Sequence, residues 1–330
     1  MSQEFTNEEA KLFLERITPN KDCLYIFQPQ GLADILCAGG FSYAAQAKKN
    51  KSSTVLIVHE SAKSFGIAYE NVSKISYIAP QILNAVKKYL DDNDIHETDN
   101  LIYGYLDTKA KNNFTVAEGL NLIDYYKKKV FDIPMDTPLI QPIIKPLSDN
   151  EINYFNKHYI LDKERTIIIV AYVSPKNLAE IKFWNDTVHK LKEKNYIVYT
   201  YIEDLSDKPI SDTEPLFANC NELCYVADKV KCFIGSHMGI LFFLAQNTAT
   251  KILAINKFPA WFWDTTKMFP NSNSRILYLA NEFINPIIEA TKKDKAIVEL
   301  EISHPKINAE DMVYSYDAML DRIFSEMENF

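Results

Sequence analysis

A chain of 330 residues exceeds the roughly 250–300 residues that one hydrophobic core usually supports, so two domains are expected. An apolar content of 47% with only 8 glycines and 14 prolines is typical of a globular protein and excludes a low-complexity chain. The net charge of −8 argues against a general nucleic-acid-binding protein, because a negative average field repels phosphate.

The N-terminal residues and the cysteines indicate the cellular compartment in which the protein is expected. The first residues, M-S-Q-E-F-T-N-E-E-A, are acidic and polar where a signal peptide needs a basic and then an apolar stretch. The longest apolar runs fall far short of the roughly 20 residues that span a bilayer. Five cysteines without a C-x-x-C pair indicate buried thiols in a reducing compartment more than a zinc site. We expect a cytoplasmic protein, and peripheral association with the inner membrane face stays open.

Strands and helices alternate through the first 131 residues. Strands are expected at 23–27, 54–59, 75–78 and 101–106, and helices within 1–20, from the loop after the first strand to about 49, and at 81–90 and 115–131. The run T-V-L-I-V-H at 54–59 is apolar almost throughout, as expected of a parallel sheet covered on both faces. The alternation predicts a doubly wound sheet.

A second series of elements follows a change in composition. Residues 133–146 hold four prolines and no helical period, which predicts an extended linker. Strands are then expected at 166–173, 196–202, 231–234, 251–255 and 275–279, and helices at 149–158 and 178–194. Apolar residues at helical spacing from Met312 to Met327 predict a last helix whose apolar side packs on the body.

These patterns predict an α/β protein with two Rossmann-like domains that face each other across a cleft, and a closing C-terminal helix. The N-terminal domain is expected at 1–140, the C-terminal domain at 141–308 and the helix at 309–330. Ligands of open parallel sheets bind beyond the carboxyl ends of the strands. Two segments there hold five of the eight glycines, at positions 31, 39, 40, 235 and 239.

The first of these segments, Q-P-Q-G-L-A-D-I-L-C-A-G-G-F, follows the first strand and leads into a helix. Asp34 stands at the start of that helix, where the helix dipole favours a negative charge. It is either a helix-capping carboxylate or a general base that can take a proton from a hydroxyl. The segment has no G-x-G-x-x-G or G-x-x-x-x-G-K-[ST] pattern, so a dinucleotide or ATP site has little support.

The second segment, G-S-H-M-G at 235–239, lies between an apolar strand and an apolar helix. Free N–H groups at the start of such a helix suit phosphate or carboxylate, and a tight connection without a ligand is the alternative. His237 within the turn can contact a ligand, stabilise charge or pack in the core.

Four further side chains of the C-terminal half are candidates for binding. Ser174 and Lys176 follow the strand at 166–173 and could hold a diphosphate. Lys182 is a binding lysine or a solvated one, and Glu222 could accept hydrogen bonds from ribose hydroxyls or lie exposed. No cluster of carboxylates and histidines suggests a metal.

The order of these motifs resembles the GT-B glycosyltransferases of the heptosyltransferase type. The N-terminal segments G-L-A-D-I-L, T-V-L-I-V-H-E and E-N-V-S-K-I-S-Y-I, and K-F-W at 182–184, are similar to the family's pattern. So is N-E-L-C-Y-V-A-D-K-V-K-C-F-I-G-S-H-M-G, although the family's D-T-G is H-M-G here and its later histidine is Phe242. The turn also resembles that of fucosyltransferase-like enzymes. The resemblance spans most of residues 22–256 as scattered short motifs.

The resemblance implies a nucleotide-sugar donor in the C-terminal domain, a glycan or glycolipid acceptor in the N-terminal domain, and neither a metal nor a cofactor. Asp34 matches the family's catalytic base, with Gln30 and Gly31 on the acceptor side, and His237 is a second catalytic candidate. The donor-binding candidates are Ser174, Lys176, Lys182, Glu222, Gly235, Ser236, His237, Met238 and Gly239.

The sequence therefore predicts a glycosyltransferase of bacterial polysaccharide or lipooligosaccharide assembly that inverts the sugar without a metal. A nucleotide-sugar epimerase on the same fold is one alternative. A non-catalytic nucleotide-sugar-binding partner subunit is another, because positions 237, 238 and 242 depart from the family. The lysines at 127–129 and at 292, 293 and 295 could meet an anionic membrane or acceptor, but solvated helix ends are the preferred interpretation.

Overall fold

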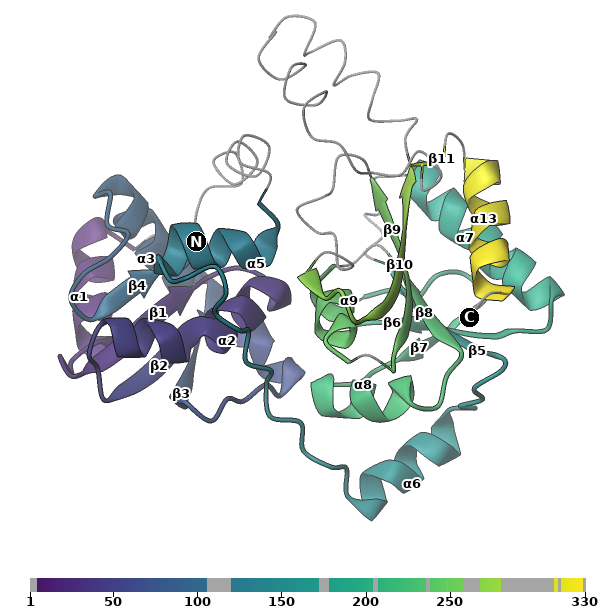
Figure 1. Cartoon of the computed structure of the whole chain (residues 1–330), viewed down its shortest axis with the longest axis horizontal. Helices are drawn as coiled ribbons and strands as arrows, with labels where there is room; N and C mark the ends of the chain where they lie inside the picture. Colours follow the sequence, from purple (N-terminus) through teal and green to yellow (C-terminus); the bar gives the residue numbers. More distant parts are fainter. Residues whose placement is uncertain are drawn as a thin grey trace, which may run out of the picture. The chain divides into compact units, whose positions relative to one another are not determined.

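A computed structural model describes residues 5–105, 120–171, 178–203, 207–235, 238–247, 249–257, 268–279, 312–313 and 316–328. The chain divides into two compact units, residues 1–114 with 122–144 and residues 115–121 with 145–330. Each unit is an α/β structure built on a parallel sheet (Figure 1). None of the helices in these ranges combines the length and the apolar content that crossing a membrane requires.

The described sheet of the first unit has four parallel strands in the order β3-β2-β1-β4. They are β1 (Cys23–Gln28), β2 (Ser53–His59), β3 (Val72–Ile78) and β4 (Leu101–Tyr103). Every residue of β1 is buried, because the strand lies between β2 and β4 and has helices on both faces. The chain moves outward from β1 to β3 and then returns to β4 on the other side of β1. The strand order therefore reverses between β1 and β4, which is where open sheets bind ligands.

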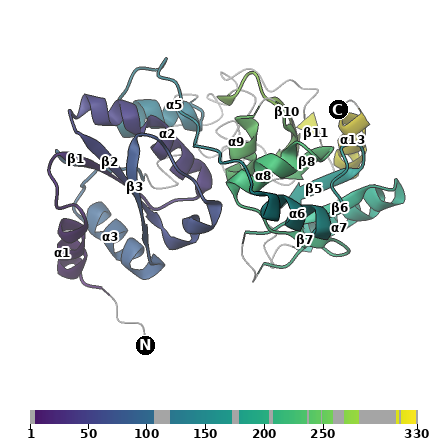
Figure 2. The ribbon, with the colours of Figure 1, turned by 90° about the horizontal axis from the view of Figure 1, so that it is seen from below.

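Helices cover both faces of this sheet (Figure 2). The helices α1 (Asn7–Ile17) and α3 (Pro80–Asp92) pack on one face with the alternate β1 side chains Cys23, Tyr25 and Phe27. On the other face lie α2 (Leu32–Lys48), the short α5 (Leu122–Tyr125) and the π-helix η2 (Tyr126–Phe131). A 3₁₀ turn, η1 (Glu60–Phe65), follows β2. Side chains of a strand alternate between faces, so Gln28 at the end of β1 faces α2.

Two predicted loop glycines are helical residues that allow close packing. Gly39 and Gly40 lie within α2. A Cβ on Gly39 would stand 2.1 Å from the Tyr69 ring, and one on Gly40 would stand 2.4 Å from Leu139. The expectation that both belong to a loop is therefore wrong, and packing against these neighbours explains the missing side chains.

The predicted linker is bound to the first unit over most of its length. The N–H of Ile140 donates to the Gly40 carbonyl at 3.1 Å, and the N–H of Ile143 donates to Ala68 at 2.8 Å. Lys127 is buried and its Nζ donates to the Met135 carbonyl at 2.7 Å. The prediction of a solvated helix end is therefore wrong for Lys127. The change from one unit to the other falls between residues 144 and 145.

The described sheet of the second unit has seven parallel strands in the order β11-β10-β9-β8-β5-β6-β7. They are β5 (Thr166–Val170), β6 (Ile197–Tyr201), β7 (Glu214–Leu216), β8 (Cys232–Gly235), β9 (Lys251–Lys257), β10 (Asn273–Leu279) and β11 (Met312–Val313). The chain moves outward from β5 through β6 to β7 and then returns to β8 beside β5. The strand order therefore reverses between β5 and β8.

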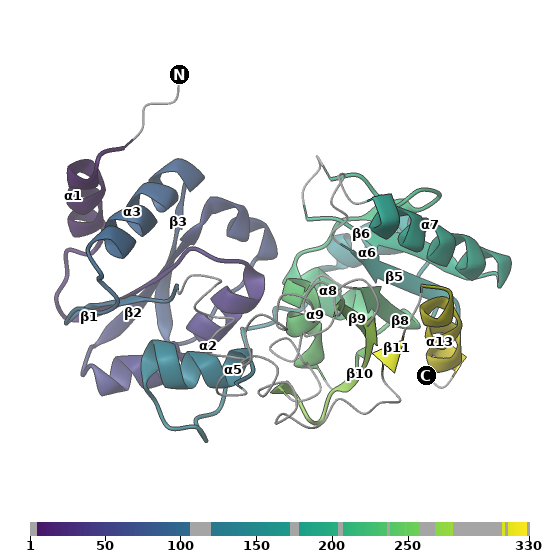
Figure 3. The same cartoon turned by 90° about the horizontal axis from the view of Figure 1, so that it is seen from above.

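The helices of this unit lie on both faces of its sheet (Figures 1 and 3). On one face, α7 (Leu178–Glu193) and α13 (Tyr316–Glu328) share a core that contains Trp184 and Met327. On the other lie α8 (Cys220–Ala227) and α9 (Met238–Ala245), and α6 (Asp149–His158) contacts α8 through Phe155 and Tyr225, whose ring centroids are 6.1 Å apart. Met312 was expected in the last helix but pairs with Tyr278 as part of β11, so that expectation is wrong.

Candidate functional site

The reversal point of the first sheet holds a buried carboxylate. β1 and β4 are paired up to Phe27 and Tyr103, so Gln28 and Gly104 follow at neighbouring strand ends. Asp34 lies in the first turn of α2 and is only 6% exposed. The N-cap of α2 is Gly31, so the cap position itself belongs to a residue without a side chain. Asp34 thus stands inside the helix, where the dipole favours its negative charge.

Three segments of the chain meet around Asp34 through hydrogen bonds. The amide Nε2 of Gln28 donates to the Gly104 carbonyl at 2.9 Å and to the Tyr126 hydroxyl at 2.6 Å. The Tyr126 hydroxyl donates to Asp34 Oδ1 at 2.8 Å. The N–H of Gln30 donates to Gln28 Oε1 at 3.0 Å, which ties the loop to the same network. These bonds hold the end of β1, the start of α2 and the start of η2 together.

Tyr126 is a neutral partner for this carboxylate. Its side chain is fully buried, and burial raises the pKa of Tyr126 well above its ordinary value. The negative charge of Asp34 acts in the same direction. A buried phenol that keeps its proton can donate a hydrogen bond at any pH at which the protein is folded.

Gly104 makes room for the network. A Cβ at this position would stand 2.6 Å from Gln28 Nε2, so a side chain there would displace the amide from both of its acceptors. Gln28, Gly104 and Tyr126 were not predicted from the sequence. A polar residue at the end of the apolar strand C-L-Y-I-F was a signal for Gln28, whereas nothing in the local sequence points to Tyr126.

His59 lies at the end of β2, beside the end of β1. Burial lowers the pKa of His59, while a hydrogen bond to the backbone of Gln30 opposes that shift. Its Nδ1 also contacts the Ser61 hydroxyl. The imidazole is therefore neutral at pH 7 and helps to hold the predicted acceptor-side loop. Gly31 in this loop is exposed, and a Cβ on it would meet nothing within 4 Å, so ligand atoms have room to approach.

The reversal point of the second sheet places the two predicted donor segments after neighbouring strands. Val170 of β5 and Gly235 of β8 are paired, and the two segments follow these residues. A Cβ on Gly235 would stand 2.0 Å from the Val170 carbonyl oxygen, so the adjacent strand accounts for this glycine. Gly239 lies in the first turn of α9, which begins at Met238. Ser174, Lys176, Ser236, His237 and the side chain of Met238 lie outside the described residues.

Glu222 and Lys182 lie on different helices, and each has a partner three or four residues away in the chain. Asn219 Oδ1 accepts from the N–H of Glu222 at 3.1 Å, and Glu222 Oε2 accepts from the N–H of Asn219 at 2.7 Å, which caps α8. Lys182 is exposed on α7 and pairs with Asp186, one turn along the helix. α7 and α8 cover opposite faces of the sheet, so the two predicted residues are not neighbours (Figure 1).

Glu203, which the sequence analysis did not identify, follows β6 at the same edge of the second sheet. Partial withdrawal from water and the negative charge of Asp207 raise the pKa of Glu203 to about 7, although much of the residue stays exposed.

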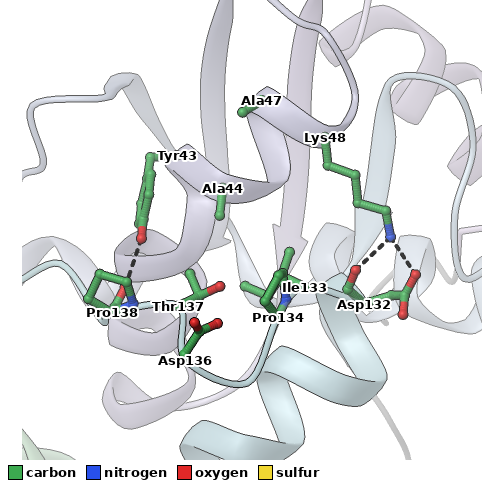
Figure 4. Close-up of a pocket in the computed structure, with 10 residues that line it drawn as sticks. All are labelled: Tyr43, Ala44, Ala47, Lys48, Asp132, Ile133, Pro134, Asp136, Thr137 and Pro138. Atoms are coloured by element: carbon green, nitrogen blue, oxygen red, sulfur yellow. Dashed lines mark hydrogen bonds and ion pairs between the residues drawn. The ribbon is translucent and has the colours of Figure 1, made fainter.

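An open pocket of about 630 Å³ lies between α2 and residues 132–138 (Figure 4). Its lining includes no member of the hydrogen-bond network around Asp34. Lys48 Nζ donates to the Phe131 carbonyl at 3.1 Å and to Asp132 Oδ2 at 2.7 Å. The Tyr43 hydroxyl donates to the Pro138 carbonyl at 3.1 Å. These bonds fasten the end of η2 and the following segment to α2, so the pocket is explained by this packing.

Comparison with known proteins identifies the fold. No protein-family model and no curated protein matches the chain. A solved glycosyl transferase family 9 structure from Veillonella parvula is 10% identical with a TM-score of 0.53, covering 93% of this chain and 97% of that one. E. coli ADP-heptose LPS heptosyltransferase II is 10% identical with a TM-score of 0.52, covering 93% and 98%. The chain has a heptosyltransferase-like glycosyltransferase fold.

The resemblance predicted from the sequence is thereby confirmed at the level of the fold. The likeness extends over both units, because it covers more than nine-tenths of each chain. One departure from the family's motif has a structural reason here. Phe242 is fully buried in α9 and contacts the Phe269 ring edge-on, with centroids 5.1 Å apart. This position therefore serves the apolar core of the second unit.

Proposed function

We propose that the protein is a glycosyltransferase that moves a sugar from a nucleotide-sugar donor to an acceptor hydroxyl. The observation that carries the proposal is the buried Asp34 carboxylate, held by Tyr126 where the first sheet reverses its strand order. The heptosyltransferase-like fold supports the class of reaction. We place this reaction in bacterial surface-glycan assembly, with a glycan or glycolipid acceptor, and a cytoplasmic location remains the prediction from the sequence.

In the proposed reaction, Asp34 acts as general base on the acceptor. It takes the proton of the acceptor hydroxyl while that oxygen attacks the anomeric carbon of the donor. The bond from the anomeric carbon to the diphosphate breaks, and its electron pair leaves with the nucleotide. Direct displacement inverts the configuration at this carbon. The role requires the two units to face each other across a cleft, with the acceptor on the first and the donor on the second.

The donor diphosphate would lie against the start of α9. The N–H groups in the first turn of this helix and its dipole suit an anion, and the helix starts beside the reversal point of the second sheet. There they would stabilise charge that develops on the leaving nucleotide, so the reaction needs no metal. The proposed donor contacts remain Ser174, Lys176, Lys182, Glu222 and the turn at 235–239, with His237 as a charge-stabilising group. Closure of the units would exclude water from the donor.

The test is the exchange of Asp34 for Asn in purified protein supplied with a panel of nucleotide sugars and acceptor glycans. Loss of a general base should lower transfer by about 10²- to 10⁴-fold, because the amide cannot accept the proton. The matched control is Asp91→Asn, since Asp91 also accepts a tyrosine hydrogen bond, from Tyr103 at 2.9 Å, but on α3 at the other face of the sheet. The control should transfer at the wild-type rate.

Three results would count against the proposal. Transfer at the wild-type rate by a folded Asp34→Asn variant would show that Asp34 is not the base. Conversion of a nucleotide sugar without any acceptor would favour an epimerase. Binding of nucleotide sugars without turnover across the whole panel would favour a non-catalytic binding subunit.

A further inference from the structure

We propose that Tyr126 is a positioning residue for Asp34, with its phenol proton directed to Asp34 Oδ1 by Gln28. The inference rests on the proposed function, because it assigns Tyr126 a part in preparing the base. It adds a third segment of the chain, η2, to the acceptor-side site.

The direction of the hydrogen bonds follows from the backbone groups at the ends of the network. Gln28 Oε1 faces the N–H of Gln30, which can only donate, and Gln28 Nε2 faces the Gly104 carbonyl, which can only accept. These two partners fix which end of the amide is which. The Tyr126 hydroxyl, 2.6 Å from Nε2, must therefore accept a hydrogen bond from Gln28.

The hydroxyl has one proton left to donate, and two acceptors lie near it. Asp34 Oδ1 is 2.8 Å away and the Gly104 carbonyl is 3.4 Å away. The shorter bond also leads to a charged acceptor, and hydrogen bonds to charged groups are the stronger ones. The proton of Tyr126 therefore points to Asp34. A hydrogen bond given to a carboxylate favours its charged form, which is the form a general base needs.

The surroundings of Tyr126 keep the phenol in place. Tyr126 begins a six-residue π-helix, a rare conformation that is often found at functional sites. Its ring packs edge-on against Tyr125, with centroids 5.8 Å apart, and at a tilt of 40° against Phe131, with centroids 6.1 Å apart. The ring therefore has little room to turn the hydroxyl away from Asp34.

The other titratable groups around the pair come from three elements. Tyr125 of α5 has its pKa raised by burial and by the charge of Asp34, so it stays neutral. Cys37, one turn along α2 from Asp34, acts electrostatically to raise the pKa of Tyr126. His59 at the end of β2 reaches the network through the Gln30 backbone.

The first test measures the pH dependence of transfer by Tyr126→Phe. Without the donated hydrogen bond the carboxylate loses a group that favours its charge, so the acidic limb of the kcat/KM profile should move up by about 1 pH unit. At neutral pH kcat should fall while the KM for the donor stays near wild type. Tyr103→Phe is the matched control, because it removes a phenol–carboxylate bond of 2.9 Å at the other face of the same sheet. A Tyr126→Phe profile that superposes on wild type overturns the inference.

The second test needs no substrate. With ¹³C-labelled aspartate, the Asp34 carboxyl signal is assigned from its loss in Asp34→Asn and followed through a pH titration by NMR. Its midpoint should move to higher pH in Tyr126→Phe and stay unchanged in Tyr103→Phe. If Tyr126→Phe does not fold, Gln28→Met removes the donor that directs the phenol proton at similar side-chain length, and a smaller shift in the same direction is expected.

The two tests separate failure of the inference from failure of the proposed function. An unmoved midpoint overturns the role of Tyr126, even if Asp34→Asn abolishes transfer. A moved midpoint in a protein that transfers no sugar from any donor supports the pairing of Tyr126 with Asp34 and counts against the proposed function.

Discussion

At the reversal point of the first sheet, hydrogen bonds join the Gln28 and Asp34 side chains through the hydroxyl of Tyr126, which lies 92 residues beyond Asp34 in the chain. At the reversal point of the second sheet, the described strand ends meet through the backbone, with Gly235 against the Val170 carbonyl. The first arrangement fixes the position of a carboxylate. In the second arrangement, Gly235 has no side chain, and this allows β8 to end directly beside the Val170 carbonyl of β5. The helix α9 begins three residues later. Among the described residues, side-chain hydrogen bonds define the first reversal point and backbone packing defines the second.

The largest effect on stability is expected from Gly235→Ala. The new Cβ would stand 2.0 Å from the Val170 carbonyl oxygen, and two paired strands cannot separate locally without losing their hydrogen bonds. The free energy of unfolding should fall by about 3 kcal/mol or more, measured by urea denaturation. Gly31→Ala is the matched control, because its Cβ would meet nothing within 4 Å. Since alanine is less favourable than glycine at a helix N-cap, its stability should fall by about 1 kcal/mol or less. Equal effects of the two exchanges would contradict the comparison.

A smaller effect is expected from Gly104→Ala, at the other reversal point. Here the new Cβ would stand 2.6 Å from Gln28 Nε2, the end of a flexible side chain that can move aside. The displaced amide would lose its bonds to Gly104 and Tyr126, so unfolding free energy should fall by about 1–2 kcal/mol. The acidic limb of the transfer profile should also move to higher pH, since the phenol proton is no longer directed to Asp34.

Thermal unfolding and the pH–rate profile of Gly104→Ala together test this expectation. A loss of stability as large as that of Gly235→Ala would show that the Gln28 side chain cannot move aside. A wild-type pH profile would show that Gln28 does not direct the proton.

The smallest effect is expected from His59→Gln, which should change how the stability of the protein depends on pH. Because the pKa of His59 is lowered in the folded protein, the unfolded chain takes up a proton first as the pH falls below about 6.5. Stability is therefore lost from that pH down to the folded-state pKa. The glutamine variant should lose less stability than wild type between pH 7 and 5, as measured by melting temperature. An identical decline of the melting temperature in both proteins would show that His59 does not contribute to the pH dependence of stability.

Local patterns in the sequence predicted most of the elements. The apolar runs gave strands close to β1, β2, β5 and β8, and the apolar stripe at 178–194 gave α7, because burial imposes a period on each segment by itself. The three-residue β7, E-P-L, was missed, since an edge strand so short and with a proline shows no period. Met312 was assigned to a helix because its spacing suited one, while pairing with β10 decided otherwise.

The sequence by itself determined the heptosyltransferase-like fold and pointed to Asp34, because a carboxylate after a strand and at a helix start is a local signal. Only the tertiary structure revealed Tyr126, Gln28 and Gly104 around it. Tyr126 is 92 residues from Asp34, and their meeting depends on how η2 packs against α2. Packing between distant segments leaves no period or motif in either one, so a carboxylate at a helix start can be found from the sequence while the groups that bind it cannot.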